Sequence, residues 1–295
     1  MRHGFLLIDK PTGPTSHDTV AQVRRALSER KIGHLGTLDP AASGLLVLAV
    51  GAKALKVVEL FQNLHKEYDA GIHFGEVSTT YDAEGVLETV ERTPGWPEPS
   101  TVDIQNTIRD HFIGKIEQVP PAYSAIKTGG ERAYRKMRQG KKVDLPARTV
   151  QIDACDISSY TYPDLLIHVA CGSGTYIRSL AHDLGAAFRC GAYLSSLHRT
   201  MVGKWSVESA ADPEKVAWGQ VIPLKDILSS FEGVEITEEE AEDLCHGRSI
   251  NREVKPDTIA WSEGLPIAIL IPLKDGSRQT PHQDGSGQAR ARKVL

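Results

Sequence analysis

The chain has 295 residues, of which 40% are hydrophobic and 24% charged, and its formal net charge is −4. These values are typical of soluble globular proteins, and the length predicts about two domains with enough core to fold without disulfide bonds. The longest apolar runs, at 45–50 and 267–271, are too short to cross a bilayer. We expect no signal peptide at the N-terminus, because Asp9 and Lys10 follow only four apolar residues.

Apolar runs and helical spacings alternate through the first part of the chain. Residues 4–8 predict a buried strand that leads into a rigid turn. Ser16 is the predicted N-cap of a helix that ends near Leu27. After a loop, residues 45–50 predict a second buried strand, and residues 52–64 predict an amphipathic helix.

Residues 66–74 alternate between polar and apolar side chains and predict a half-buried strand. One face of this strand carries Tyr68, Ala70, Ile72 and Phe74. Residues 75–85 are polar and irregular, and a loop at 93–100 precedes a predicted helix at 102–112.

The middle of the chain predicts strands at 151–157 and 165–171, and then a helix at 175–188 that is entered through a Gly-Ser-Gly segment. Because strands and helices alternate without repeats, we predict a mixed α/β core.

From about residue 231 the composition changes. An acidic helix precedes predicted strands at 258–261 and 266–271, which indicates a small, separate β-rich domain. Residues 275–293 are nearly devoid of apolar side chains, so we predict a mobile loop or tail there.

The sequence contains four cysteines, Cys155, Cys171, Cys190 and Cys245. They form neither a CxxC pair nor a metal-finger spacing. We therefore expect buried thiols in a reducing compartment, and a cytoplasmic protein.

Charge is unevenly distributed along the chain. The segment 127–142 contains a single acid, Glu131, and seven basic residues: Lys127, Arg132, Arg135, Lys136, Arg138, Lys141 and Lys142. The segment 232–242 instead carries six glutamates and neither Lys nor Arg. A basic stripe can bind phosphate whatever the total charge. A solvated helix face explains the stripe equally well, so both interpretations stay open here.

Residues 33–44, GHLGTLDPAASG, contain three glycines and a proline and predict a loop. Asp39 stands in this loop five residues after His34. An Asp-Pro turn explains the dipeptide alone, because Asp bonds its own downstream backbone and Pro presets φ. A functional carboxylate is the alternative.

A second glycine-containing segment, 172–178, leads into a predicted helix but lacks the Gly-Lys-Ser/Thr ending of a P-loop. Arg178 falls in the first turn of that helix, where the helix dipole disfavours a cation. We therefore expect a carboxylate partner, either Asp39 or Asp82. An exposed arginine is the alternative.

Two other kinds of site are disfavoured. No histidine pair has His-x-x-x-His spacing, and His73 should point away from Tyr68 on its strand, so we predict no metal site. No G-x-S-x-G motif is present, and Ser43 and Ser173 show no neighbouring base, which argues against a serine hydrolase.

Six segments between residue 4 and about residue 205 resemble, in order and spacing, the motifs of the TruB family of bacterial tRNA pseudouridine synthases. They are GFLLIDKPTGPTSHD, GHLGTLDPAASGLL, KEYDAGIHFG, QVPPAYSAIKTGGERAYRKMRQGKKV, CGSGTYIRSLAHDLG and GAYLSSLHRTMVG. The resemblance implies an α+β fold with a mixed-sheet catalytic core at 1–230, an RNA-binding insertion near 115–150, and a β-rich PUA-like domain at 231–295.

The resemblance also implies a role for individual residues. Asp39 matches the catalytic aspartate, Tyr68 the tyrosine that stacks on the target base, and Arg178 a partner of the catalytic carboxylate. The expected substrate or RNA contacts are His34, Lys10, Asp82, Tyr176, Leu197, Lys127 and Arg132. The chain departs from the usual motifs at Leu35, Ala54-Leu55, Thr79 and His198. These departures put details of RNA contact in question.

The implied activity converts the uridine of the TΨC loop of tRNA (position 55) to pseudouridine, by base flipping and an aspartate-dependent exchange of the N1 glycosidic bond for a C5 bond. Asp39 either attacks the nucleotide or abstracts a ribose proton. No metal or organic cofactor is implied. The expected partner is the TΨC stem-loop, with no membrane, no obligate protein partner and a monomeric enzyme. The alternatives are a guide-RNA-dependent synthase of the Cbf5 type and an RNA-folding chaperone.

Overall fold

The computed structural model describes residues 3–124, 126–128, 130–140, 143–273 and 287–295. Within these ranges, only the backbone is described for Lys127, Thr128, Arg132, Tyr134 and Arg138. No helix in the described part of the chain is long and apolar enough to span a membrane.

A ten-stranded sheet runs through the larger part of the molecule, in the order β14-β1-β3-β12-β4-β11-β10-β7, with β2 paired to β3 and β13 to β12. Its strands are β1 (Gly4–Lys10), β2 (Ile32–His34), β3 (Ser43–Val50), β4 (Lys66–Phe74), β7 (Gly114–Gln118), β10 (Arg148–Thr161), β11 (Asp164–Cys171), β12 (Ala192–Val202), β13 (Trp205–Ser206) and β14 (Ile222–Pro223). This mixed sheet agrees with the predicted fold class.

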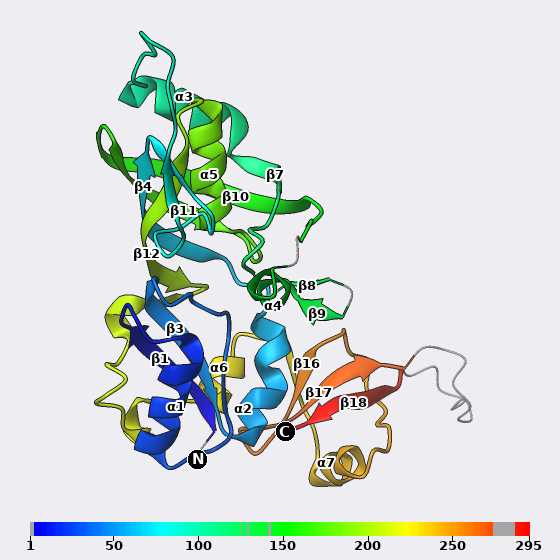
Figure 1. Cartoon of the computed structure of the whole chain (residues 1–295). Coiled ribbons are helices and arrows are strands. Elements are labelled where there is room, and N and C mark those ends of the chain that lie inside the picture. The colour runs from blue at the N-terminus through cyan, green and yellow to red at the C-terminus, as the bar shows by residue number, and fades with distance from the viewer. Residues whose placement is uncertain (1–2, 125, 129, 141–142, 274–286) are drawn as a thin grey trace.

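The helices divide between two lobes (Figure 1). The lower lobe holds α1 (Ser16–Leu27), α2 (Ala52–Val57) and α6 (Leu224–Leu228) around β1 and β3. The upper lobe holds α3 (Thr101–His111) and α5 (Ile177–Ala187), whose apolar side chains share one core with β4, β11 and β12. Burial of this apolar surface is the main force that joins helices to sheet.

Two predicted helix limits need correction. The N-cap of α1 is Thr15, because the Asp18 side chain reaches back to its backbone in a capping box. Ser16, the predicted cap, is buried. Its hydroxyl donates to the carbonyl of Leu38 at 2.8 Å and accepts from the amide of Leu38 at 2.9 Å. The helix predicted at 52–64 ends at Val57 and continues as a 3-10 turn, η1 (Val58–Phe61).

Strand β4 has the predicted alternation. Tyr68, Ala70, Ile72 and Phe74 are 8%, 2%, 0% and 1% exposed. His73 points the other way, as expected, and its Nδ1 lies 2.7 Å from Oδ1 of Asp164. The face of β4 that meets the core was therefore predicted correctly.

Strand β12 joins the two lobes and was not predicted as a strand. It pairs with β4 over most of its length, but it meets β3 in parallel through only two residue pairs, His198 with Ser43 and Arg199 with Gly44. Irregularities in its pairing with β4, between Leu194 and Ser196 and between Arg199 and Met201, interrupt the regular register. Such bulges weaken the period-two signal on which strand prediction depends.

The C-terminal region forms a separate four-stranded sheet, in the order β15-β16-β17-β18, with α7 (Glu238–Cys245) beside it. The strands are β15 (Gly233–Glu235), β16 (Thr258–Ser262), β17 (Leu265–Pro272) and β18 (Ala289–Val294). Strand β18 lies within the predicted tail, so that prediction was wrong for 289–293. Residues 275–286 of the predicted tail lie outside the described residues.

Strand β18 also explains how this region attaches to the core. Arg292 and Lys293 reach Glu59 of η1 at 2.9 and 2.7 Å. Ile259 and Ile269 belong to the same apolar cluster as residues of β1 and α2. Two alanines, Ala289 and Ala291, suffice to pack the inner side of the strand. This is why its composition looked like that of a tail.

An outward-facing histidine on β11 predicts a pH-dependent contribution to stability. His168 contacts Asp69 at 2.8 Å and Glu67 at 3.4 Å. The hydrogen bond to Asp69, followed by the nearby carboxylate charges, raises the pKa of His168 above its ordinary value of 6.5. The ion pairs therefore stabilise the fold fully below pH 6.5, and the contribution is lost as pH rises through the raised folded-state pKa.

We expect His168→Gln to lower the thermal midpoint by about 1–2 °C at pH 6 and by less at pH 8.5, since half-exposed ion pairs contribute little. Thermal unfolding of both proteins across this range measures the difference. The His73–Asp164 and His65–Asp153 pairs are present in both proteins and cancel in the comparison. A difference that does not change with pH would contradict the assignment.

Candidate active site

The loop that carries Asp39 connects β2 to β3 and is fixed along its length. Leu35 and Leu38 are 6% and 3% exposed, so they anchor the loop in the core. The amide of Ala42 donates to the carbonyl of Asp39 at 3.1 Å, which closes the predicted Asp-Pro turn. The Asp39 side chain itself is 42% exposed. The turn therefore exposes the carboxylate of Asp39 to solvent, while the leucines on either side are buried.

Arg178 in the first turn of α5 binds two carboxylates. Its Nη2 lies 3.0 Å from Oδ2 of Asp39, and its Nη1 lies 3.1 Å from Oδ2 of Asp82. The guanidinium also donates to the carbonyls of Thr80, at 3.2 Å, and Tyr123, at 3.1 Å. The side chain is 9% exposed. Both expected partners are therefore present, and the alternative of an exposed arginine is wrong.

A strained turn presents Asp82 to Arg178. Tyr81, between the two acceptors Thr80 and Asp82, has φ of +65°, a conformation that bulky residues rarely adopt. Its ring stacks on the imidazole of His182, with centroids 3.9 Å apart and an 8° angle between planes. His182 lies four residues after Arg178, on the same face of α5. The stack ties the strained turn to the helix that carries the arginine.

Sequence reasoning missed this pair. A tyrosine beside an aspartate in a polar loop carries no sequence signal for positive φ. The only available signal was the four-residue spacing between Arg178 and His182, which places both on one helix face.

Tyr68 lies on β4 with its side chain in the core. Burial raises the pKa of its phenol, and a hydrogen bond and the positive charge of Arg199 partly oppose this effect. Tyr68 and Arg199 are direct neighbours across the β4–β12 pair. The phenol is therefore neutral at physiological pH.

We expect Tyr68→Phe to lower the turnover rate constant about 10²–10⁴-fold if the phenol transfers a proton in the reaction. RNA affinity should change less than about threefold, because the phenyl ring keeps the stacking surface. Single-turnover kinetics and filter binding separate the two effects. Retention of the full turnover rate by Tyr68→Phe would remove the phenol from the chemistry and leave Tyr68 as a stacking platform.

His34 lies at the end of β2 beside the loop. Its Nδ1 is buried and makes no hydrogen bond to the described residues, and its ring meets that of His17 edge-on at 5.5 Å. Burial first, and then the charges of His17 and Arg199, lower the pKa of His34. The imidazole is therefore neutral, which suits insertion between bases.

Lys10 does not lie where a direct RNA contact requires it. The residue is 0% exposed, and its Nζ donates to the carbonyls of Pro11 and Pro14 at 2.8 Å and of Pro40 at 3.5 Å. Because Pro40 directly follows Asp39, the Lys10 ammonium binds the backbone of the Asp39 loop. The structure assigns Lys10 to the loop backbone in place of the predicted RNA contact.

Two of the expected substrate contacts, Tyr176 and Leu197, lie at the start of α5 and on β12. Tyr176 directly precedes α5, and its backbone amide and carbonyl are both bonded to the side-chain amide of Gln118. Leu197 of β12 is half-buried against the main core. Their contact with a base stays a prediction.

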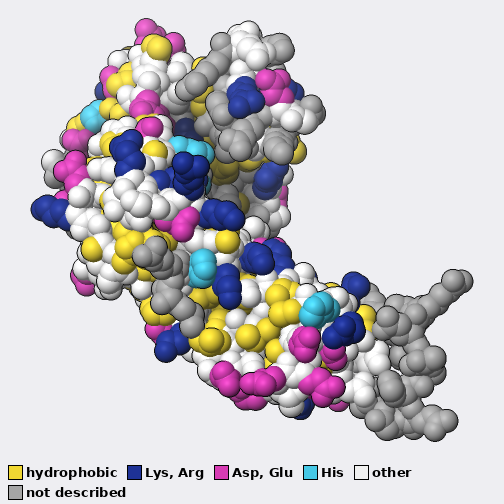
Figure 2. All heavy atoms as spheres, turned by 90° about the horizontal axis from the view of Figure 1, so that it is seen from below, with side chains coloured by type: hydrophobic (Ala, Val, Ile, Leu, Met, Phe, Trp, Pro, Cys, Tyr) yellow, Lys and Arg dark blue, Asp and Glu magenta, His cyan; other side chains and the backbone are white. Residues whose placement is uncertain are grey.

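The basic stripe forms a hairpin of β8 (Lys127–Thr128) and β9 (Glu131–Arg132) followed by α4 (Ala133–Arg138). The side chains of Lys127 and Arg132 lie outside the described residues, so their RNA contacts stay a prediction. Figure 1 draws this hairpin between the upper lobe and the C-terminal sheet. Seen from below, Lys and Arg side chains gather across the middle of the molecule, and carboxylates cluster at its lower margin (Figure 2).

One sequence expectation is contradicted beside the loop. Ser43 was predicted to have no neighbouring base, yet its Oγ lies 2.9 Å from Nδ1 of His198. The pair arises from the short β3–β12 contact, which the sequence did not reveal. Asp69 lies opposite His198 on β4, but among the described residues no ion pair or hydrogen bond joins His198 to a carboxylate, so the pair lacks the third member of a catalytic triad.

Charges of both signs meet around Asp39. Arg178 binds the carboxylate, and the Lys10 ammonium and the Arg199 guanidinium bind carbonyls of the loop itself. The nearby acids are Asp82 and Glu84. Burial, followed by repulsion from Asp82 and Asp39, raises the pKa of Glu84.

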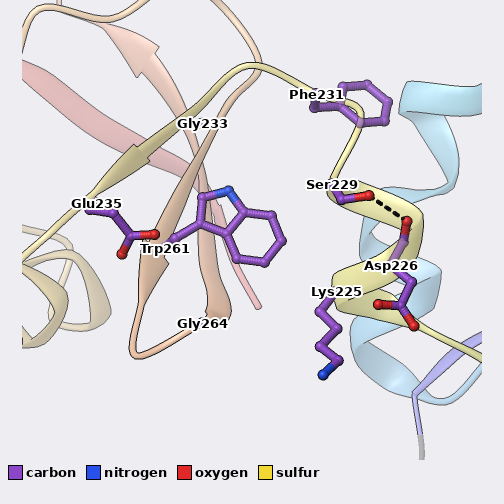
Figure 3. Close-up of a pocket in the computed structure, with 8 residues that line it drawn as sticks. All are labelled: Lys225, Asp226, Ser229, Phe231, Gly233, Glu235, Trp261 and Gly264. Carbon is purple, nitrogen blue, oxygen red and sulfur yellow. Dashed lines mark hydrogen bonds between the residues drawn. The ribbon is translucent and has the colours of Figure 1, made fainter.

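A pocket of about 450 Å³ lies elsewhere, between α6 and the C-terminal sheet (Figure 3). It is lined by Lys225, Asp226, Ser229, Phe231, Gly233, Glu235, Trp261 and Gly264. None of the predicted site residues lines it. The chemistry of Asp39 and Arg178 is therefore separate from this pocket.

Comparison with solved structures supports the fold. A chain from a structure described as "Crystal Structure of a Cbf5-Nop10-Gar1 Complex" matches with a TM-score of 0.70 and 24% identity, over 99% of this chain and 84% of the other. A chain from an H/ACA RNP bound to a substrate RNA containing 2′-deoxyuridine matches with a TM-score of 0.69 and 22% identity, again over 99% and 84%. At this identity the likeness concerns the fold.

Sequence comparison identifies the family. The tRNA pseudouridine synthase B of Leifsonia xyli is 42% identical over 283 residues, covering 91% of this chain and 89% of the relative. The protein of the same name from Thermobifida fusca is 40% identical over 261 residues, covering 85% and 87%. The model of the TruB family pseudouridylate synthase N-terminal domain matches residues 24–177, which include Asp39, Tyr68 and Asp82. This chain therefore belongs to the TruB family of pseudouridylate synthases.

Proposed function

We propose that this enzyme isomerises the uridine of the TΨC loop of tRNA to pseudouridine, with Asp39 as the reacting carboxylate. The observation that carries the proposal is the position of Arg178, which binds both Asp39 and Asp82. Asp39 itself lies in a loop whose backbone is fixed on both sides. The names of the relatives support tRNA as the substrate. RNA binding alone does not require a buried arginine, Arg178, that is paired with an exposed carboxylate, Asp39.

The reaction conserves all atoms of the nucleotide. The N1–C1′ bond breaks, the uracil turns within the site, and a C5–C1′ bond forms. The proton on C5 leaves to a base, and N1 gains a proton. Because the uracil is neither released nor oxidised, the steps need a carboxylate, a proton acceptor and a closed surface around the base.

The geometry supports a separate task for each group. Arg178 orients Asp39 through the ion pair between them, at 3.0 Å. Asp82 and the carbonyls of Thr80 and Tyr123 fix the guanidinium from its other sides. Tyr68 offers a stacking face for the uracil and a phenol for the C5 proton. Asp39 acts either on the nucleotide directly or on a ribose proton.

The target base must leave its stack, at a cost of about a few kcal/mol. His34, neutral and beside the loop, offsets part of this cost by filling the vacated stack. The hairpin β8–β9 and α4 contact backbone phosphates, which position the RNA without reading its sequence. The region from residue 231 supports the core or grips another part of the RNA. We expect the enzyme to act as a monomer in the cytoplasm, without a protein partner.

Purified enzyme and an unmodified tRNA transcript labelled with tritium at C5 of uridine test the proposal. Tritium release to solvent is expected with no other RNA or protein present. Binding of the transcript without any tritium release would leave an RNA-binding chaperone as the better account. Release that requires an added guide RNA would favour the Cbf5-type alternative.

Phosphate contact also predicts a strong salt dependence. With four to six phosphates neutralised, raising monovalent salt fourfold should weaken RNA affinity about 50–1,800-fold, since single-stranded and duplex contacts release counterions on binding. Filter binding between 50 and 200 mM salt measures the slope. An affinity that does not change over this range would contradict phosphate contact by the positive groups.

A further inference from the structure

Arg199 is the largest of the completely buried side chains, at 1% exposure, and it carries a charge. Burying a cation is costly unless it is paired or fully hydrogen-bonded. None of the ion pairs among the described residues includes Arg199. It is satisfied by main-chain carbonyls, and the position of these carbonyls indicates what the residue does.

Its three nitrogens hold both ends of the Asp39 loop. Nη2 donates to the carbonyl of Gly36 at 3.1 Å, and Nη1 reaches that of Thr37 at 3.5 Å, on the N-terminal side of Asp39. Nε donates to the carbonyl of Leu45 at 2.7 Å, on the C-terminal side. One rigid guanidinium therefore fixes the separation of the two loop ends.

The same residue contacts the strand that carries Tyr68. In the sheet, Arg199 pairs with Tyr68 on β4 and with Gly44 on β3. A Cβ at position 44 would lie 2.4 Å from the carbonyl oxygen of Arg199, so β3 and β12 approach closely at this point. The positive charge of Arg199 lowers the pKa of the Tyr68 phenol, against the larger opposing effect of burial. Arg199 therefore binds the loop that carries Asp39 and lies opposite Tyr68 in the sheet.

We infer that Arg199 is a positioning residue for the isomerisation, which holds the Asp39 loop in a fixed place relative to the strand that carries Tyr68. The inference rests on the proposed function. Only arginine can do this, because its planar fork directs several donors at once, whereas a lysine ammonium is a single point charge on a flexible stem. Stability alone does not call for a buried cation, since an apolar side chain of similar volume packs as well or better.

Arg199→Lys keeps the charge and removes the fork. We expect the single-turnover rate constant to fall at least about 10²-fold, which is the effect of a misplacement of about 1 Å. The Kd for the tRNA transcript should stay within about threefold. In Tyr68→Phe, the further loss caused by Arg199→Lys should be clearly smaller, because groups that act together are not additive.

Two control variants separate positioning from general stability. Arg252→Lys changes another arginine, which binds Glu240 in the C-terminal region at 2.8 Å, and should leave the rate unchanged. Leu244→Ala, in the separate apolar cluster of the C-terminal region, should lower the thermal midpoint and leave the rate of the folded enzyme unchanged. Loss of rate in Leu244→Ala to the same degree as in Arg199→Lys would overturn the inference.

Hydrogen exchange tests the inference independently of turnover. The amides of residues 35–42 should exchange about tenfold faster or more in Arg199→Lys than in wild type, and those of β16 and β17 should exchange at the same rate. Unchanged exchange in the loop would overturn the inference, even if the enzyme were active. If the loop of Arg199→Lys exchanged faster but the wild-type enzyme released no tritium, the positioning role would stand and the proposed function would be rejected.

Discussion

Replacement of Asp39 by Asn is expected to reduce pseudouridine formation by at least about 10⁴-fold, the scale on which loss of a reactive side chain acts. The amide has nearly the shape of the carboxylate, but it can neither attack the nucleotide nor accept a ribose proton at neutral pH. RNA affinity should remain within about threefold, because the positive groups around the loop are unchanged. Single-turnover tritium release and filter binding on the same preparation measure both quantities.

The structure supplies two internal controls for this variant. Arg178 keeps Asp82 and the carbonyls of Thr80 and Tyr123 as partners, so Asp39→Asn should fold normally. Ser43→Ala removes the hydroxyl that faces His198 at 2.9 Å in the same loop region and should retain turnover. Activity that survives in Asp39→Asn and disappears in Ser43→Ala would move the chemistry to the Ser43–His198 pair and contradict the assignment.

Replacement of Arg178 by Ala is the second large effect, and it has two components. The turnover rate constant should fall about 10²–10³-fold, because the cation that orients Asp39 is lost. The free energy of unfolding should fall by about 3–5 kcal/mol, because Asp82, with a side chain 6% exposed, keeps a buried charge without its partner. Single-turnover rates and denaturant unfolding report the two components separately.

A second substitution distinguishes these components. Adding Asp82→Asn to Arg178→Ala removes the unpaired buried charge, so the double variant should recover stability but not turnover. RNA affinity should change much less than rate in both proteins. Equal losses in affinity and rate for Arg178→Ala would place the guanidinium on the RNA backbone and contradict its role as the partner of Asp39.

The Arg178 network shows how far sequence reasoning reached. The helix-dipole argument required an acidic partner for Arg178, and both acids that it named are present. Local rules also placed Tyr68 correctly on the core face of β4, because the alternation along a strand is strict. These predictions depend on neighbours in sequence or on one regular element.

The contacts that escaped prediction depend on segments far apart in the chain. Strand β12 joins both lobes through bulged pairing, so neither its role nor the Ser43–His198 contact could be inferred from local pattern. Lys10 was expected to contact RNA because of its place in a family motif, but the fold directs its ammonium at the carbonyls of Pro11 and Pro14. Strand β18 was mistaken for a tail because an edge strand needs few apolar residues.

The central claim is that this chain alone converts the TΨC-loop uridine of tRNA to pseudouridine. Incubation of the pure enzyme with an unmodified transcript, followed by nucleotide-resolution mapping of pseudouridine, tests it most directly. The account predicts one pseudouridine, in the TΨC loop, absent with Asp39→Asn and formed without any guide RNA. Modification at a different position, or none without an added RNA or protein, would contradict it.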